Sequence, residues 1–232
     1  AYEGMERFFP KEKIILTGNP VRQNLTSGTK EEALKYFNET FGVQFTAERK
    51  TLLIIGGSLG ARTINQSIVA HLSELIESGI QVIWQTGKNY YADCQKALSN
   101  HLSPIANTPS PIICTDFVSQ MPLAYALADL VISRAGASSI SELCLLGKPS
   151  ILVPSPNVAE DHQTHNAMAL VKKQAAVLVK DMNAHSELIA TALQLIEDDQ
   201  QLHELHTHIL TLALPDSARI IAAEVMQLAQ KK

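Results

Sequence analysis

Short apolar runs alternate along this chain with amphipathic stretches of helical length, and this alternation constrains the fold more than any other feature. The predicted strands are Leu52–Ile55, Gln81–Gln85, Ile112–Cys114, Leu130–Ser133, Ser150–Val153 and Ala176–Val179. The predicted helices are Arg62–Glu77, Tyr90–Ser99, Met121–Ala128, Ser139–Leu146 and Thr164–Lys173, with more helix from His185 onward and a surface loop at Ser103–Pro111. Strands that alternate with helices form a parallel sheet whose right-handed crossovers cover both faces. The sequence therefore predicts an α/β fold.

The first fifty residues do not follow this alternation. A short predicted strand, Ile14–Thr17, runs into a Gly-Asn-Pro turn, and the chain starts without an initiator Met. We therefore expect a fragment, with residues 1–22 as the tail of a missing upstream domain and an interdomain linker. Residues 23–215 are expected to form one ligand-binding domain. Residues 216–232 are predicted to form a capped helix that either packs on the sheet or reaches back to the missing domain.

Charge and cysteine content narrow the possible functions. The 232 residues carry 19 Lys and Arg against 23 Asp and Glu, and this net charge of −4 argues against a nucleic-acid partner. No apolar run reaches the ~20 residues that a membrane-spanning helix needs. The cysteines Cys94, Cys114 and Cys144 have no paired spacing, so we expect reduced, buried thiols of a cytoplasmic protein and no zinc site.

A glycine-rich turn, Gly56–Ala61, directly follows the first predicted strand and opens a helix. Glycine lets the backbone approach an anion closely, and a helix N-terminus offers unpaired N–H groups with a partial positive charge. Gly57 and Ser58 are therefore candidates for binding a phosphate, with the Ser58 hydroxyl as a donor. The alternatives are that the turn serves only packing, and that Ser58 is the N-cap of the helix.

A second turn of small residues follows the strand that ends at Ser133 and again opens a helix. It predicts a second anion or polar-ligand site. Glu142 lies about one turn into this helix, where its carboxylate can accept hydrogen bonds from both hydroxyls of a ribose. The alternative is a capping box, in which Ser139 is the N-cap and Glu142 is its partner three residues later.

Polar residues gather in Asp161–Asn166, after the strand that ends at Val153. Gln163 and Asn166 supply donors and acceptors that suit sugar hydroxyls, and a solvated helix start is the alternative. His162 has no Ser or Cys partner in a recognisable frame, so we assign it no catalytic role.

The segment after Ile112–Cys114 contains a candidate for base recognition. The backbone N–H and C=O of Val118 are placed to contact the edge of a base, whereas Phe117 is expected in the core. The glycine spacing differs from the dinucleotide fingerprint, and the chain has no Walker sequence and no Asp-x-Asp pair. We therefore expect no cofactor and no metal, with the charge of a diphosphate held by helix N-termini, Ser58 and Arg22.

Together these segments resemble the MurG family, the UDP-N-acetylglucosamine:N-acetylmuramyl-(pentapeptide) pyrophosphoryl-undecaprenol N-acetylglucosamine transferases. The matching motifs are Gly-Asn-Pro-Val-Arg, Gly-Gly-Ser-x-Gly-Ala, Phe-Val-x-x-Met, Ser-Arg-Ala-Gly-Ala, Ser-Glu-Leu, Gly-Lys-Pro-Ser-Ile-Leu-Val-Pro and Asp-His-Gln-Thr-x-Asn-Ala, in the family's order and spacing. The resemblance runs from Ala1 to Lys232 and covers the back two-thirds of such an enzyme. It implies the C-terminal, donor-binding half of a GT-B type glycosyltransferase, with a Rossmann-like parallel sheet and helices on both faces.

The resemblance also implies roles for residues around UDP-N-acetylglucosamine. Ser58 contacts the diphosphate, and Val118 meets uracil through its backbone. Glu142 binds the ribose, and Gln163 with Asn166 holds the sugar. The other implied donor-site residues are Arg22 and Gly57, with Ala137, Ser138, Ser139, Ile140 and Ser141 lining the nucleotide pocket.

The implied reaction transfers N-acetylglucosamine, with inversion, to undecaprenyl-pyrophosphoryl-muramyl-pentapeptide (lipid I to lipid II) in peptidoglycan synthesis, which supports cell shape and division. No catalytic residue is assigned to this chain, because the family's expected base and acceptor groove lie in the N-terminal domain. The chain alone is expected to bind UDP weakly and not to catalyse transfer.

The resemblance further implies a peripheral protein on the cytoplasmic face of the inner membrane that associates with other cell-wall synthesis proteins. Two alternatives remain open. One is another GT-B type UDP-sugar enzyme, such as a diacylglycerol glycosyltransferase or a UDP-sugar 2-epimerase. The other is a non-catalytic nucleotide-binding module.

Overall fold

The computed structural model describes residues 9–102 and 111–230, apart from the side chain of Glu160. Its centre is a six-stranded parallel sheet in the order β3-β2-β1-β4-β5-β6. The strands are β1 (Thr51–Ile55), β2 (Gln81–Gln85), β3 (Ile112–Thr115), β4 (Leu130–Ser133), β5 (Ser150–Leu152) and β6 (Val177–Leu178). This strand order is that of the doubly wound Rossmann fold, so the predicted Rossmann-like α/β fold is confirmed.

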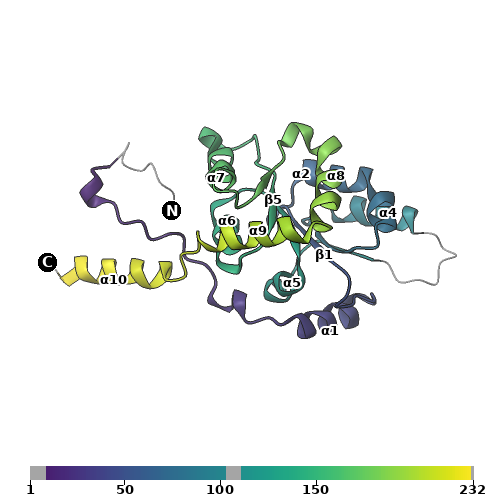
Figure 1. Ribbon diagram of the computed structural model, residues 1–232, viewed down its shortest axis with the longest axis horizontal. Helices are drawn as coiled ribbons and strands as arrows, with labels where there is room; N and C mark the ends of the chain where they lie inside the picture. The colour runs from purple at the N-terminus through teal and green to yellow at the C-terminus, as the bar shows by residue number, and fades with distance from the viewer. Residues whose placement is uncertain (1–8, 103–110, 231–232) are drawn as a thin grey trace.

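Helices form a layer on each face of the sheet (Figure 1). One face carries α2 (Arg62–Ala70), α3 (Leu72–Glu77), α4 (Tyr91–His101) and α8 (Ala184–Ile196). The other carries α1 (Lys30–Phe41), α5 (Met121–Leu127), α6 (Ala137–Leu146) and α7 (His162–Val171). The remaining elements are α9 (Asp199–Leu210), α10 (Ser217–Gln230) and the short 3-10 turns η2 (Lys11–Lys13), η3 (Gln23–Thr26), η4 (Ala159–Asp161) and η5 (Asp181–Asn183). Within the described ranges, every helix is too short or too polar to span a bilayer.

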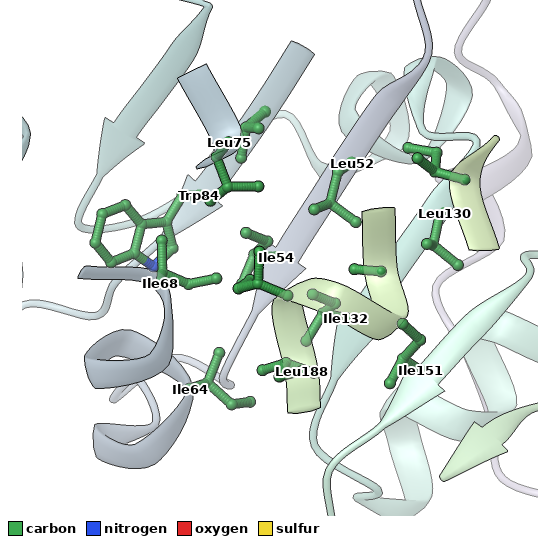
Figure 2. Close-up of a cluster of buried hydrophobic side chains, with 14 of the residues drawn as sticks. Leu52, Ile54, Ile64, Ile68, Leu75, Trp84, Leu130, Ile132, Ile151 and Leu188 are labelled. Carbon is green, nitrogen blue, oxygen red and sulfur yellow. The ribbon is translucent and has the colours of Figure 1, made fainter. Parts of the chain in front are cut away.

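The central strand β1 is buried on both sides. Leu52 and Ile54 belong to one hydrophobic cluster, and Leu53 and Ile55 belong to the other. Figure 2 shows the first cluster, with Ile54 among side chains from α2, β2 and α8. Apolar residues at every position of β1 are therefore required, because successive side chains of a strand point to opposite faces.

The predicted helix Arg62–Glu77 is wrong as a single element, because the helix breaks at His71. The backbone of His71 leaves helical geometry (φ −123°, ψ 25°), and its N–H bonds to the Ile68 carbonyl oxygen at 3.1 Å. The His71 ring nitrogen Nδ1 lies 2.9 Å from the Ser67 carbonyl oxygen. Apart from the predicted strand Ile14–Thr17, the other predicted helices and strands begin and end within two residues of the observed bounds. The predicted loop at Ser103–Pro111 lies outside the described residues, except for Pro111.

The predicted strand Ile14–Thr17 is also wrong. The two edges of the sheet are β3 and β6, and no described strand pairs with this segment. Ile15 and Leu16 are 53% and 50% exposed, so the segment does not add to the core. Residues 1–8 of the predicted linker lie outside the described residues.

The last helix, α10, extends away from the sheet (Figure 1). Its buried residue is Ser217, whereas Val225, Met226 and Leu228 are 60%, 63% and 66% exposed. The alternative that this helix packs on the sheet is therefore wrong. A Cβ atom on Gly18 would lie 2.7 Å from Ser217 Oγ, so the segment before Arg22 passes directly against the start of α10.

Helix α1 was not predicted, although its start carries a capping signal. The Thr29 side chain accepts a hydrogen bond from the Glu32 backbone N–H, and the Glu32 carboxylate accepts one from the Thr29 N–H. The spacing Thr-x-x-Glu is the sequence signature of such a box. Replacing Thr29 by alanine is expected to lower the free energy of unfolding by about 1 kcal/mol. Urea denaturation of both proteins measures this loss, and an unchanged midpoint would contradict a stabilising cap.

Candidate functional site

A cleft of about 640 Å³ opens at the carboxyl ends of β1, β4 and β5. It is lined by the glycines and Ala61 of the Gly56–Ala61 turn, though not by Ser58, and by the turn around Gly136, the loop Ser155–Asn157, Gln163 and Asp181. The chain leaves β1 and β4 in opposite directions along the sheet, so the cleft lies at the topological switch point, where open α/β sheets bind ligands. Three of the four polar segments singled out in the sequence therefore meet at one place.

The Gly56–Ala61 turn presents backbone to this cleft. Gly57 and Gly60 have φ values of 84° and 80°, and the Gly60 N–H bonds to the Gly57 carbonyl oxygen at 3.1 Å. The N-cap of α2 is Ala61, so the alternative that Ser58 caps this helix is wrong. Ser58 is exposed and has no hydrogen-bond partner within the described part of the chain, which leaves its hydroxyl available to a ligand.

Glu142 is held by contacts that the sequence did not predict. Helix α6 begins at Ala137, so Ser139 already lies inside the helix and the capping-box alternative for Glu142 is wrong. Instead, Glu142 Oε2 accepts a hydrogen bond from the Tyr125 hydroxyl at 3.1 Å, and Oε1 lies 3.4 Å from an Arg22 guanidinium nitrogen. Arg22 and Glu142 are therefore side by side, although neither lines the cleft.

Tyr125 is a permanent donor to this carboxylate. Its side chain is 1% exposed. Burial, reinforced by the charge of Glu142, raises the pKa of the Tyr125 phenol well above its ordinary value, so the phenol keeps its proton at neutral pH. The Arg22 side chain is 56% exposed, and an ion pair in solvent contributes only ~0–1 kcal/mol. Glu142 is thus fixed by Tyr125 and only loosely engaged by Arg22.

The start of α6 is tied to the N-terminal segment. Asn19 Nδ2 donates to the Ala137 carbonyl oxygen at 3.2 Å and to Ser141 Oγ at 3.1 Å. Ser141 Oγ in turn donates to the Ala137 carbonyl oxygen at 2.9 Å. Ile140 is 2% exposed and packs in the core, so its side chain does not line the cleft, whereas Ser139 does. Ser138 lies beside Ser139 in the first turn of the helix.

The hydrogen bonding of Val118 and the burial of Phe117 differ from what the sequence predicted. Val118 is 5% exposed, and its N–H is already bonded to Gln85 Oε1 at 2.9 Å. Its carbonyl oxygen accepts no hydrogen bond from the described residues, so the carbonyl is the group still open to a base. Phe117 is 55% exposed, so the prediction that it lies in the core is wrong.

Gln163 and Asn166 separate into two roles. Gln163 lines the cleft, where its Oε1 accepts a hydrogen bond from the Ser155 N–H at 2.9 Å. Asn166 is 6% exposed, and its Nδ2 donates to the Ala135 carbonyl oxygen at 3.0 Å, so it anchors α7 to the turn after β4. The His162 ring is exposed, and its Nδ1 lies 2.9 Å from the Ala159 carbonyl oxygen.

The cleft also contains a charged network that was not predicted from the sequence. The Arg134 guanidinium donates to the Val153 carbonyl oxygen at 3.0 Å and pairs with Asp181, whose other carboxylate oxygen accepts from Thr63 Oγ1 at 3.0 Å. The side chains of Arg134 and Asp181 are 14% and 18% exposed. Asp181 follows β6 in the same way that the other polar segments follow their strands, and this position is the sequence signal for it.

The cysteines are buried, as predicted. Burial raises the pKa of Cys94 and Cys144 to about 11 and that of Cys114 to about 12, so all three are protonated thiols at neutral pH. Among residues 9–102 and 111–230, no group of three or more His, Cys, Asp or Glu side chains is placed to hold a metal ion.

Residues 51–219 match the model of the glycosyltransferase family 28 C-terminal domain. The chain is 54% identical to the UDP-N-acetylglucosamine–N-acetylmuramyl-(pentapeptide) pyrophosphoryl-undecaprenol N-acetylglucosamine transferase of Parabacteroides distasonis, over 100% of this chain and 60% of that protein. The chain thus spans about 60% of the length of the curated relatives it matches.

Solved structures share the fold. The crystal structure of Acinetobacter baumannii MurG has a TM-score of 0.68 at 25% identity, over 97% of this chain and 59% of that one. The UDP-GlcNAc 2-epimerase of Neisseria meningitidis, bound to UDP-GlcNAc, has a TM-score of 0.60 at 19% identity, over 96% and 57%. The second likeness concerns the fold alone.

Proposed function

Because this chain belongs to glycosyltransferase family 28 as its C-terminal domain, we propose that it is the donor-binding domain of a UDP-N-acetylglucosamine transferase. The full-length enzyme is an inverting transferase that moves N-acetylglucosamine to undecaprenyl-pyrophosphoryl-muramyl-pentapeptide (lipid I to lipid II). The observation that carries this proposal is the cleft at the switch point, where two small-residue turns, each opening a helix, face one space. Backbone N–H groups at two helix starts suit a diphosphate.

In this proposal, the diphosphate lies between the Gly56–Ala61 turn and the start of α6, with Ser58 as a side-chain donor. Gln163 and the loop Ser155–Asn157 hold the sugar. The uracil meets the carbonyl of Val118, because the Val118 N–H is engaged by Gln85. The ribose binds to Glu142 and displaces the exposed Arg22 guanidinium, while Tyr125 keeps the carboxylate in place.

The chemical contribution of this chain is to stabilise the leaving group. When an acceptor hydroxyl attacks the anomeric carbon, negative charge develops on the departing UDP, and preorganised N–H groups stabilise that charge. The acceptor groove and the base belong to the rest of the enzyme. In this proposal, residues 1–22 are the tail of the N-terminal domain and the interdomain linker, and residues 216–232 are the helix that crosses back to that domain, which agrees with the exposed apolar residues of α10.

The proposed acceptor also determines where the enzyme acts in the cell. Its acceptor is anchored in lipid, so the full-length protein works as a peripheral protein on the cytoplasmic face of the inner membrane. Other cell-wall synthesis proteins are its expected partners. The chain by itself binds UDP and does not catalyse transfer, and turnover of lipid I by residues 1–232 alone would contradict this assignment.

Isothermal titration of the chain with UDP-N-acetylglucosamine, UDP-glucose and UDP-galactose tests the function. We expect UDP-N-acetylglucosamine to bind most tightly, because Gln163 and the loop after β5 line the sugar end of the cleft. Equal affinity for the three sugars would favour another UDP-sugar enzyme of this architecture. No heat of binding with any of them, or with UDP, would contradict a nucleotide site.

Replacing Glu142 by alanine is expected to weaken UDP binding by about 1.5–3 kcal/mol, because hydrogen bonds to a charged group are lost. Titration calorimetry with UDP measures the change. Glu204 provides the matched control, since it is an exposed helical glutamate on α9 that accepts a hydrogen bond from Gln200. Glu204→Ala should bind UDP like the unmodified chain. An unchanged affinity in folded Glu142→Ala would remove the ribose role.

A further inference from the structure

Gln85 is the last residue of β2, and its side chain is buried with 3% exposure. Its Nε2 donates to the Gly57 carbonyl oxygen at 3.0 Å, and its Oε1 accepts from the Val118 N–H at 2.9 Å. Gly57 follows β1 and Val118 follows β3, the two strands that flank β2 in the sheet. One side chain therefore joins the loops that leave both neighbouring strands.

We propose that Gln85 is a positioning residue of the donor site, which sets the glycine turn and the Val118 loop at a fixed separation. This inference rests on the proposed function, in which the turn binds the diphosphate and Val118 meets the base. UDP spans both places. A shift of either loop therefore misplaces one end of the ligand while the other end is bound. The affinity for the whole nucleotide then falls.

Glutamine suits this position because its amide offers a donor and an acceptor from one planar group. Both are used here. Leucine would leave the Gly57 carbonyl and the Val118 N–H without this partner. Glutamate would still accept from Val118, but as a carboxylate it has no proton for the Gly57 carbonyl. Leucine therefore removes both hydrogen bonds of Gln85, whereas glutamate removes only the one to Gly57.

The backbone beyond Gln85 packs against the same turn. A Cβ atom on Gly87 would lie 2.3 Å from the Gly60 nitrogen, so the two turns touch backbone to backbone. The loop after β2 is itself fixed by α2, since Asn65 Nδ2 donates to the Thr86 carbonyl oxygen at 2.8 Å. The glycine turn that faces the cleft thus packs against the loop after β2, and Gln85 adds the connection to Val118.

Gln81, at the opposite end of β2, provides a matched control. It is also fully buried, and its Nε2 donates to the Thr46 carbonyl oxygen at 3.1 Å and to Thr51 Oγ1 at 3.0 Å. It too fixes a loop through a buried amide, but it does so at the amino ends of the strands, away from the cleft. A general loosening of the fold would affect both variants alike.

The test is calorimetric titration of Gln85→Leu, Gln85→Glu and Gln81→Leu with UDP, with urea denaturation of each variant. We expect Gln85→Leu and Gln85→Glu each to lower UDP affinity by at least about 10-fold, since the buried glutamate carboxylate would face the Gly57 carbonyl oxygen, and we expect Gln81→Leu to bind as the unmodified chain does despite its lower stability. If Gln85→Leu does not fold, the comparison of Gln85→Glu with Gln81→Leu decides.

Unchanged UDP affinity in folded Gln85 variants would overturn the positioning role, and so would equal losses in the Gln85 and Gln81 variants. Either result would leave the proposed function standing, because the unmodified chain would still bind UDP. Failure of the unmodified chain to bind UDP would instead contradict the proposed function itself.

Discussion

Replacing Gly60 by alanine is expected to lower UDP affinity on the order of 100-fold, because in the proposed site the glycine turn would shift away from the diphosphate. Gly60 has a φ of 80°, and a Cβ atom placed on it would lie 1.9 Å from the Thr86 carbonyl oxygen. This oxygen is backbone, and it is already held by Asn65. The Gly56–Ala61 turn must therefore move, since Thr86 cannot.

The same substitution should lower the free energy of unfolding by about 2–4 kcal/mol, from the clash together with the strained φ. Gly79→Ala separates the two causes, because Gly79 has a φ of 76° but no atom within 4 Å of an added Cβ. Gly79→Ala should cost ~1–2 kcal/mol of stability and leave UDP binding unchanged. Calorimetry and urea denaturation measure both quantities. A folded Gly60→Ala protein with undiminished UDP affinity would show that the turn only packs.

The fold was predictable because its signal is local. The run Thr51–Ile55 is apolar beyond its first residue, and a strand buried on both faces needs this pattern. The break at His71 was not predictable in the same way, since the helical periodicity continues through it. Helix α1, which was not predicted, carries a local capping signal in Thr29 and Glu32.

The position of the candidate site was predictable from the sequence, but the hydrogen-bond partners of its residues were not. Ligand groups were expected after the strands, and the cleft lies there. The partners of these groups come from distant parts of the chain: Gln85 binds the Val118 N–H, and Tyr125 binds Glu142. A single sequence gives no register between such segments, so which donors are already engaged emerges only when the sheet is assembled.

Ile54→Ala is expected to lower the free energy of unfolding by about 2–5 kcal/mol, the usual cost of removing a large aliphatic side chain from a packed core. Ile54 is 0% exposed, and Figure 2 shows it near the centre of its cluster. The side chains around it come from β2, α2 and α8, which cannot all move inward to fill the space. Most domains have only about 5–15 kcal/mol of total stability, so the shift in the urea midpoint should be large.

Ile15→Ala removes the same atoms from a side chain that is 53% exposed, so its effect should stay below about 1 kcal/mol. The contrast between Ile54 and Ile15 measures burial and excludes a general effect of shortening isoleucine. Ile54 does not line the cleft, so the folded fraction of Ile54→Ala should bind UDP with the affinity of the unmodified chain. Equal urea midpoints for the two variants would contradict the central position of β1, and weakened UDP binding by folded Ile54→Ala would show that the core of the sheet and the cleft are not independent.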